Sequence, residues 1–365
     1  MDSVTHVVMG AAIGEALLGR KLGNRALVWG AFFGSLPDID VLFGLLVDTS
    51  WNLILHRGVT HSLFAWVAAI AGLSPWLAKL WKKDKVTRGE AAVFIAATIG
   101  SHLLLDCLTA YGTKLFAPFS NFPVAFNCLF IIDPFVTLPL LVTVGWLAFL
   151  KKKDPKRRKL CLRGLMITAI YIVMAVGVKF WISSGFEADL QRRQVKLQRR
   201  MEAPTVLDLF LWRSVVDRGD EFWIGYRSLF ESSSTPVRWV VVPKGTEYFA
   251  PVAGLSEAQR VDRFSDGWWV ARPTAKGVWI ADMRFGEMRA WERKATVDLR
   301  PPFSWQLIKE AEKDRLRKIQ PEDRKAAEHL KRLALRVFGN RADWEGNPRL
   351  TGNPGSLPEI LEAVE

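Results

Sequence analysis

The chain has 365 residues, half of them hydrophobic, with 16 tryptophans and a formal net charge of +13. Its positive mean hydropathy of +0.10 fits a membrane part joined to a soluble part. The three cysteines include no Cys-x-x-Cys pair, which argues against a thiolate zinc site or a disulfide scaffold. Much of the positive charge lies in short loops beside apolar segments, where membrane orientation explains it better than nucleic-acid binding does.

Charge divides the chain into two parts. Residues 1–184 hold 19 Lys and Arg against 10 Asp and Glu, whereas residues 185–365 hold 31 against 27. The sparsely charged part predicts an α-helical polytopic membrane domain over 1–184. A small, mainly-β soluble domain is expected over 185–300, followed by a charged, helical and partly disordered tail over 301–365.

The first apolar segment, residues 3–19, begins beside Asp2 rather than beside positive charge, so it predicts a retained helix and not a signal peptide. Gly10 and Gly14 have the spacing that lets two membrane helices approach closely. His6 lies within this segment.

Residues 26–47 are long enough to cross a bilayer, but Pro37-Asp38-Ile39-Asp40 interrupts them. The proline is expected to break the helix. Two carboxylates at membrane depth are costly unless they are paired, metal-bound or in a wet cavity. An alternative interpretation is a loop between two short helices, with the aspartates capping the second helix.

Four further apolar segments have spanning length: 62–81, 91–110, 129–150 and 162–184. The basic runs at 82–85 and 151–163 predict cytoplasmic ends for the spans beside them. Threading the helices from these runs places the polar residues of the apolar segments together at the outer face. The second half of the chain then also lies outside, although the basic residues after the last span fit that side less well.

From residue 204 the pattern changes to runs of aromatic and β-branched residues separated by turn signals. Strands are expected near residues 207–216, 222–230, 237–242, 268–271 and 278–284. These runs predict a small antiparallel sheet or barrel that ends near residue 300. Residues 304–338 predict a charged helix interrupted at Pro321, with His329 on its surface.

The candidate ligands are neutral imidazoles and carboxylates, which suit zinc and similar divalent ions. His102 and Asp106 are four residues apart, so both side chains share one helix face. Arg57 is a fixed cation suited to holding a phosphate oxygen, and we assign it a catalytic role together with Asp40. The full predicted ligand set is His6, Asp38, Asp40, His56, His61, His102, Asp106 and Asp133.

Three of these assignments have simpler alternatives. His6 is as well explained by an ordinary hydrogen-bonded histidine as by a ligand. The role of Asp106 is open too, because its carboxylate suits either metal binding or the orientation of His102. Asp133-Pro134 has the form of a helix N-terminus with proline at its first position.

The sequence resembles the YdjM family of bacterial inner-membrane proteins. The resemblance covers about residues 1–185 and depends on Thr5-His6, the segment Gly34–Asp40, His56-Arg57-Gly58-Val59-Thr60-His61-Ser62 and the segment His102–Gly112, with Asp133-Pro134 also similar. Residues 204–286 resemble the soluble extension of some members. The resemblance implies a membrane-bound metal-dependent hydrolase of the inner membrane, and the family is also described as LexA-binding.

The first hypothesis is therefore an integral membrane hydrolase that uses a divalent metal, zinc in the simplest case, and a metal-activated water on a lipid-like or phosphoester substrate. The second is a non-enzymatic membrane regulator that binds a protein partner such as LexA, which requires residues 204–340 in the cytoplasm. The third is a transporter with a His/Asp relay, which needs no stoichiometric metal.

Overall fold

The computed structural model describes residues 1–44, 46–206, 209–232, 234–286, 288–290, 297–308, 315–319, 326–341, 344 and 355–356. The chain divides into two compact units. A helical unit comprises Met1–Val47 and Leu55–Gly177, and a β unit comprises Asp48–Ile54 and Val178–Glu365. The predicted domain boundaries at 184 and 300 stay predictions.

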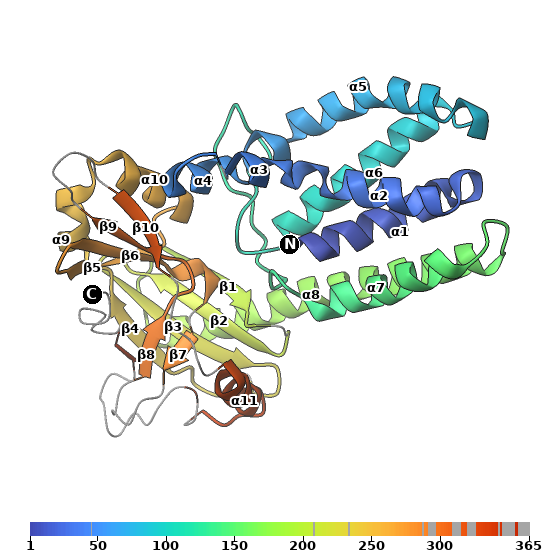
Figure 1. The fold of residues 1–365 in the computed structure, drawn as a ribbon. Helices are drawn as coiled ribbons and strands as arrows, with labels where there is room; N and C mark the ends of the chain where they lie inside the picture. Colours follow the sequence, from blue (N-terminus) through green and yellow to red (C-terminus); the bar gives the residue numbers. More distant parts are fainter. Residues whose placement is uncertain are drawn as a thin grey trace. The chain divides into compact units, whose positions relative to one another are not determined.

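The first half of the chain is helical (Figure 1). Its elements are α1 (Ser3–Leu22), α2 (Asn24–Ser35), η1 (Leu36–Ile39), α3 (Asp40–Gly44), α4 (Thr49–Leu55), η2 (Val59–His61), α5 (Leu63–Leu80), η3 (Lys82–Asp84), α6 (Arg88–Cys107), α7 (Pro134–Phe149) and α8 (Lys156–Arg192). The last of these runs eight residues beyond the expected end of the final apolar segment.

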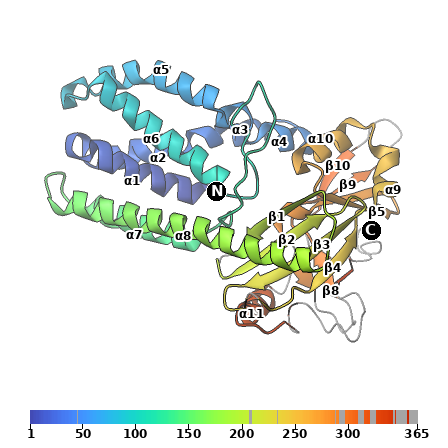
Figure 2. The ribbon, with the colours of Figure 1, turned by 180° about the vertical axis from the view of Figure 1, so that it is seen from behind.

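Four helical stretches are long and apolar enough to cross a membrane: Asn24–Gly44, α5, α6 and α8. The apolar α7 is shorter. Helix α1 is not among the four, and more than half of its residues are buried, which agrees with a helix packed against others. The views from both sides show α7 beside α8 (Figure 2). The predicted polytopic helical region is confirmed.

Helix α1 packs against α2 through glycines. A methyl group added at Gly10 would collide with the carbonyl oxygen of Gly30, and one added at Gly14 would collide with that of Ala26. The two backbones are therefore in direct contact, as the spacing of Gly10 and Gly14 predicted. Helices α5 and α6 complete this core, in which Phe33 of α2, Leu77 of α5 and Phe94 of α6 are all buried.

The predicted break at Pro37 is confirmed. Helix α2 ends at Ser35, and one 3₁₀ turn, η1, carries Pro37 and Asp38 before α3 begins at Asp40. Proline fits this first turn because no earlier carbonyl needs its missing N–H. The polar segment after α4 also lacks regular helix, since Arg57 has a positive φ of 56°.

The β unit contains two four-stranded antiparallel sheets, ordered β1-β2-β3-β4 and β10-β9-β6-β5, and a three-stranded sheet, β11-β8-β7. The strands are β1 (Arg199–Pro204), β2 (Leu211–Asp217), β3 (Glu221–Ser228), β4 (Trp239–Pro243), β5 (Trp269–Thr274), β6 (Gly277–Asp282), β7 (Met288–Ala290), β8 (Val297–Arg300), β9 (Ser304–Ile308), β10 (Arg315–Ile319) and β11 (Gly355–Ser356). Its helical elements are α9 (Thr246–Phe249), η4 (Ala250–Val252), α10 (Ser256–Ser265), η5 (Met283–Phe285) and α11 (Ala326–Val337).

Each predicted strand overlaps an observed one, from β2 to β6, although residues 207 and 208 lie outside the described part of the chain. Strand β1 was not predicted, because its Arg199-Arg200 start is too polar to stand out. The two four-stranded sheets meet through aromatic side chains, for example Phe222 stacked on Trp268 with ring centroids 5.8 Å apart.

The prediction of a helix over residues 304–338 is wrong for the first half of that range. Residues Ser304–Ile308 pair with β6 and residues Arg315–Ile319 pair with β9, so both are strands. Among the described residues of this stretch, only α11 is helical. The backbone pairing of β9 with β6, and of β10 with β9, outweighs the local helical preference of this segment. His329 is also buried rather than on the surface, with its ring 5.0 Å from that of Trp344.

Candidate metal centre

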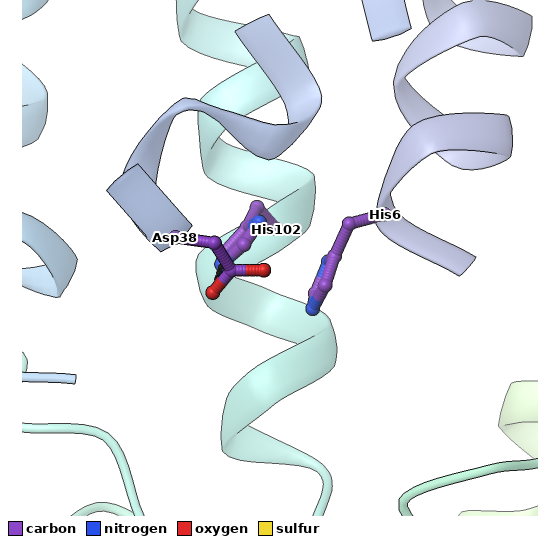
Figure 3. Close-up of side chains that lie close together, drawn as sticks. All are labelled: His6, Asp38 and His102. Carbon is purple, nitrogen blue, oxygen red and sulfur yellow. Dashed lines mark ion pairs between the residues drawn. The ribbon is translucent and has the colours of Figure 1, made fainter. Parts of the chain in front are cut away.

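Four segments of the helical unit bring the candidate residues together. Asp38 and Asp40 come from η1 and the start of α3, His61 from η2, and His102 and Asp106 from one face of α6. His6 comes from α1, and its ring stacks on that of His102 with centroids 3.6 Å apart. Figure 3 shows His6 and Asp38 converging on His102 from different helices.

Four side-chain atoms face one another at the middle of this cluster. Nε2 of His61 and Nε2 of His102 are 3.1 Å apart. Oδ1 of Asp38 lies 3.4 Å from the first nitrogen and 3.6 Å from the second (Figure 3 shows the His102 contact). Oδ2 of Asp106 lies 3.4 and 3.5 Å from the same two atoms. Two ligands about 2.0–2.2 Å from one tetrahedral zinc ion lie about 3.3–3.6 Å apart, so these distances fit a shared ion.

The tautomer of His102 is set by the backbone. Its Nδ1 lies 2.7 Å from the carbonyl oxygen of Gly34, which can only accept a hydrogen bond. Nδ1 therefore carries the proton, and a neutral His102 presents a lone pair at Nε2. This is the usual arrangement of a metal-binding histidine, whose second nitrogen is held by an outer partner.

His61 is held in the same way by a carboxylate and a hydroxyl group. Its Nδ1 lies 3.3 Å from Oδ2 of Asp40 and 3.0 Å from the hydroxyl oxygen of Thr60. The Thr60 hydroxyl donates its proton to Asp40 at 2.7 Å, so toward His61 its oxygen accepts. Nδ1 of His61 therefore donates, and a neutral His61 presents a lone pair at Nε2 toward the centre.

With both imidazoles neutral and protonated at Nδ1, the cluster thus gathers four potential ligand atoms. Two imidazole lone pairs and two carboxylate oxygens face one another, and Oδ2 of Asp106 has no hydrogen-bond partner within the described part of the chain. The side chains of His61, His102 and Asp106 are fully buried, and that of Asp38 is 16% exposed. Such an arrangement repels itself unless a cation lies among the four atoms.

The other oxygen of Asp106 faces positive and donor groups. Oδ1 accepts from Nη2 of Arg57 at 2.9 Å and lies 3.1 Å from Nε2 of His6, and the Met1 amino group also contacts it. Arg57 is buried, donates to Thr109 and lies 4.5 Å over the ring of Tyr111. Its guanidinium group is therefore paired with a ligand carboxylate rather than free to hold a phosphate.

Asp40 and His56 form an outer pair. Oδ1 of Asp40 lies 3.0 Å from Nδ1 of His56, and Oδ2 accepts the backbone N–H of Arg57 at 3.0 Å. Asp38, Asp40 and His56 can also be grouped as candidate ligands, as can His6, Asp38 and His102, or His61, His102 and Asp106. The geometry favours the last group together with Asp38, because the contacts of their histidine nitrogens with one another and with the two carboxylates are all 3.1–3.6 Å long.

Asp133 is in none of these groups, among the residues that the structure describes. Its carboxylate caps α7 by accepting the N–H of Phe135, and it accepts the hydroxyl of Tyr171 at 2.9 Å. This geometry agrees with the alternative of a helix N-terminus before Pro134.

The sequence interpretation did not identify the outer partners at Gly34, Thr60, Thr109 and Tyr111. Ser62 is the residue that caps α5, accepting the N–H of Ala65 at 3.1 Å. Every residue has a backbone carbonyl, so the sequence does not indicate that the carbonyl of Gly34 accepts a hydrogen bond from His102. Thr60 could have been identified, because it lies beside a predicted ligand.

These features define a class of protein: a helical membrane unit with a buried His/Asp cluster, followed by a β unit. Residues 1–182 match the family described as YdjM inner membrane protein. The helical part of this chain therefore belongs to the YdjM family, and the resemblance noted from its motifs is confirmed.

Two curated proteins are similar to part of the chain. The inner membrane protein YbcI of Escherichia coli (strain K12) is 33% identical over 110 residues, which cover 30% of this chain and 61% of that protein. The uncharacterized protein YfhP of Bacillus subtilis (strain 168) is 31% identical over 159 residues, covering 40% of this chain and 47% of that protein. Both matches span less than two thirds of the relative's length. No solved structure matches the chain.

Proposed function

We propose that the helical unit is a metal-dependent hydrolase of the inner membrane. The observation that carries this proposal is the convergence of four potential ligand atoms on Asp38, His61, His102 and Asp106, of which the five contacts that involve a histidine nitrogen are 3.1–3.6 Å long. Imidazole and carboxylate ligands at this spacing suit zinc best among common divalent ions. A bound ion of this kind would lower the pKa of a water molecule and supply the nucleophile.

The remaining polar residues position the ligands. Asp40 accepts hydrogen bonds from Thr60 and the Arg57 backbone, and it holds the Nδ1 proton of His61. This arrangement favours a positioning role for Asp40 over the catalytic role first assigned to it. Arg57 orients Asp106 and offsets its charge, and His6 contacts the same carboxylate.

The substrate reaches the centre from the side of Asp38 and His56 in this proposal. The side chain of Asp38 is 16% exposed and that of the neighbouring His56 is 24% exposed. The other three proposed ligands, His61, His102 and Asp106, are fully buried. A lipid-like or phosphoester substrate fits a centre at the end of membrane helices. Positive charge in the loops at 82–85 and 151–163 supports the outer face as the location of both the centre and the β unit.

A proton-relay transporter is the second candidate, and one feature favours it. His6, Asp106, His61, Asp40 and His56 form a continuous chain of polar contacts of 3.0–3.4 Å. Such a chain is able to pass protons without a metal. The regulator hypothesis, with a protein partner such as LexA, requires the β unit in the cytoplasm and is tested by its location.

Elemental analysis of detergent-purified protein separates the first two candidates. Wild-type protein is expected to hold about one divalent ion per chain, and His61→Ala and His102→Ala are expected to lose it. Asp133→Asn is the matched control, because its carboxylate caps α7 outside the cluster, and it should retain the ion. Monodisperse elution and unchanged circular dichroism show that each variant is folded.

A wild-type protein without bound metal after growth and purification in zinc-supplemented buffer rejects the metal centre. Equal metal content in wild type and both histidine variants rejects it as well. Either result leaves the relay as the better explanation of the polar chain.

A further inference from the structure

The segment between α6 and α7 is unusually apolar for a loop. Residues 108–133 contain one lysine, Lys114, and one acidic residue, the buried Asp133. Four phenylalanine side chains in this segment are exposed, two of them by 84% and 65%. We call them the phenylalanine rim: Phe116, Phe119, Phe122 and Phe126. An exposed apolar group of this size marks an interaction surface.

The loop that carries the rim contacts residues beside the candidate ligands. The N–H of Leu63, which follows the His61 motif, donates to the carbonyl of Leu115 at 2.9 Å. Arg57 lies over the ring of Tyr111 in the same segment. Thr113 and Val124 pair as a two-residue bridge that closes the loop. The rim is therefore held at the end of the helices where the candidate ligands lie.

The surroundings of the rim indicate what covers it. Phe119 lies edge-on to Phe64 at the start of α5, with centroids 6.3 Å apart, and Phe64 is itself 58% exposed. Phe135 at the start of α7 is exposed as well. The rim is thus continuous with apolar helix faces that meet lipid. Irregular backbone is not tolerated among acyl chains, so the loop backbone belongs at the interface with its rings directed inward.

We propose that the phenylalanine rim inserts into the lipid leaflet beside the metal centre and is covered by the acyl chains of the bilayer. The centre then faces the head groups of that leaflet. For the proposed hydrolase, on which this consequence depends, the substrate class is an amphiphile whose polar group lies at the interface and whose chains stay in the membrane.

Nitroxide labels at Phe119→Cys and Phe122→Cys test the proposal in the full chain reconstituted in phosphatidylglycerol–phosphatidylethanolamine vesicles. The three native cysteines are buried, and unsubstituted protein measures their background labelling. Val67→Cys on the exposed face of α5 is the lipid reference, and Lys83→Cys in η3 is the water reference. Collision rates with oxygen and with a water-soluble nickel chelate are compared at each position.

The ratio of the oxygen to the nickel collision rate at positions 119 and 122 is expected to be several-fold above that at position 83 and closer to that at position 67. A ratio equal to that at position 83 overturns the proposal, because the rim then lies in water. Low collision rates with both probes overturn it too, because a protein partner or a second copy then covers the rim. Repeating the measurement in His61→Ala separates the two proposals, since insertion of the rim does not need the metal.

Discussion

The two units bury charge in opposite ways. In the β unit, the fully buried Asp282 accepts hydrogen bonds from Arg284, at 2.7 Å for the closest pair, and from the backbone N–H of the same residue. In the helical unit, Asp38 and Asp106 direct oxygens at two histidine nitrogens that also present lone pairs. The first arrangement is complete with the chain's own donors, whereas the second brings together side chains that could hold a metal ion.

This contrast shows why burial of charge by itself does not identify a functional site. Asp282 is as deeply buried as Asp106. Both carboxylates have a guanidinium partner, Arg284 for Asp282 and Arg57 for Asp106. Both oxygens of Asp282 accept hydrogen bonds, whereas Oδ2 of Asp106 has no hydrogen-bond partner among the described residues, which makes Asp106 a candidate ligand. The presence or absence of donors at hydrogen-bond distance is therefore the informative quantity.

The largest change in stability is expected from removing Arg284, which donates hydrogen bonds to Asp282 in the β unit. Arg284→Ala leaves Asp282 buried without its guanidinium partner and is expected to lower the free energy of unfolding by about 3–5 kcal/mol. Urea unfolding of the full chain in detergent, followed by tryptophan fluorescence, measures this change. Metal content should stay at the wild-type level.

Arg332→Ala is the matched control for that variant. Arg332 pairs with Glu328 across one turn of α11, where both side chains are partly exposed, and its loss should cost about 0.5 kcal/mol or less. If both arginine variants unfold at the same urea concentration, the Asp282 pair does not stabilise the β unit.

The next effect concerns the outer carboxylate of the helical unit. Asp40→Asn keeps the shape of the side chain but removes the charge that holds the Nδ1 proton of His61. Metal affinity is expected to fall about 10–100-fold without complete loss of binding. Competition with a fluorescent zinc chelator measures the dissociation constant.

Asp38→Asn provides the comparison for Asp40, because Asp38 belongs to the proposed ligands. It should weaken binding more than Asp40→Asn does. The reverse order would mean that Asp40 is the ligand and Asp38 the outer residue.

The smallest effect is a pH dependence in the β unit. Burial favours a higher pKa for Glu231, but Arg341 at 2.8 Å and Arg336 at 3.0 Å outweigh it and hold the pKa below its ordinary value of 4.5. A carboxylate whose pKa is lower in the folded than in the unfolded state stabilises the folded protein fully at pH values above its pKa in the unfolded chain. This stabilisation is lost as the pH falls through the lower pKa of the carboxylate in the folded protein.

Glu231→Gln is therefore expected to cost about 1.5 kcal/mol at pH 7 and progressively less below pH 4.5. Thermal unfolding of the wild-type protein and of Glu231→Gln, compared at the same pH between about pH 3 and pH 7, measures the difference in their stability. A difference that is constant over this range would show that the charge of Glu231 contributes nothing.

Much of the fold could be predicted from local sequence. Apolar segments of spanning length, the proline at position 37 and the alternating aromatic runs specify the main helices, the break after α2 and the strands β2 to β6. His102 and Asp106 could also be placed on one face, because a four-residue spacing on a helix allows no other result.

Tertiary structure decided the rest, because it depends on segments that are distant in sequence. Asp38 and Asp40 are only two residues apart, but the 3₁₀ turn between α2 and α3 places them on different sides of His61. Asp38 faces Nε2 of His61, whereas Asp40 faces Nδ1 of the same ring. Gly34 sets the tautomer of His102 across 68 residues. The strands β9 and β10 likewise form because β9 pairs with β6 and β10 then pairs with β9, and no local preference encodes that pairing.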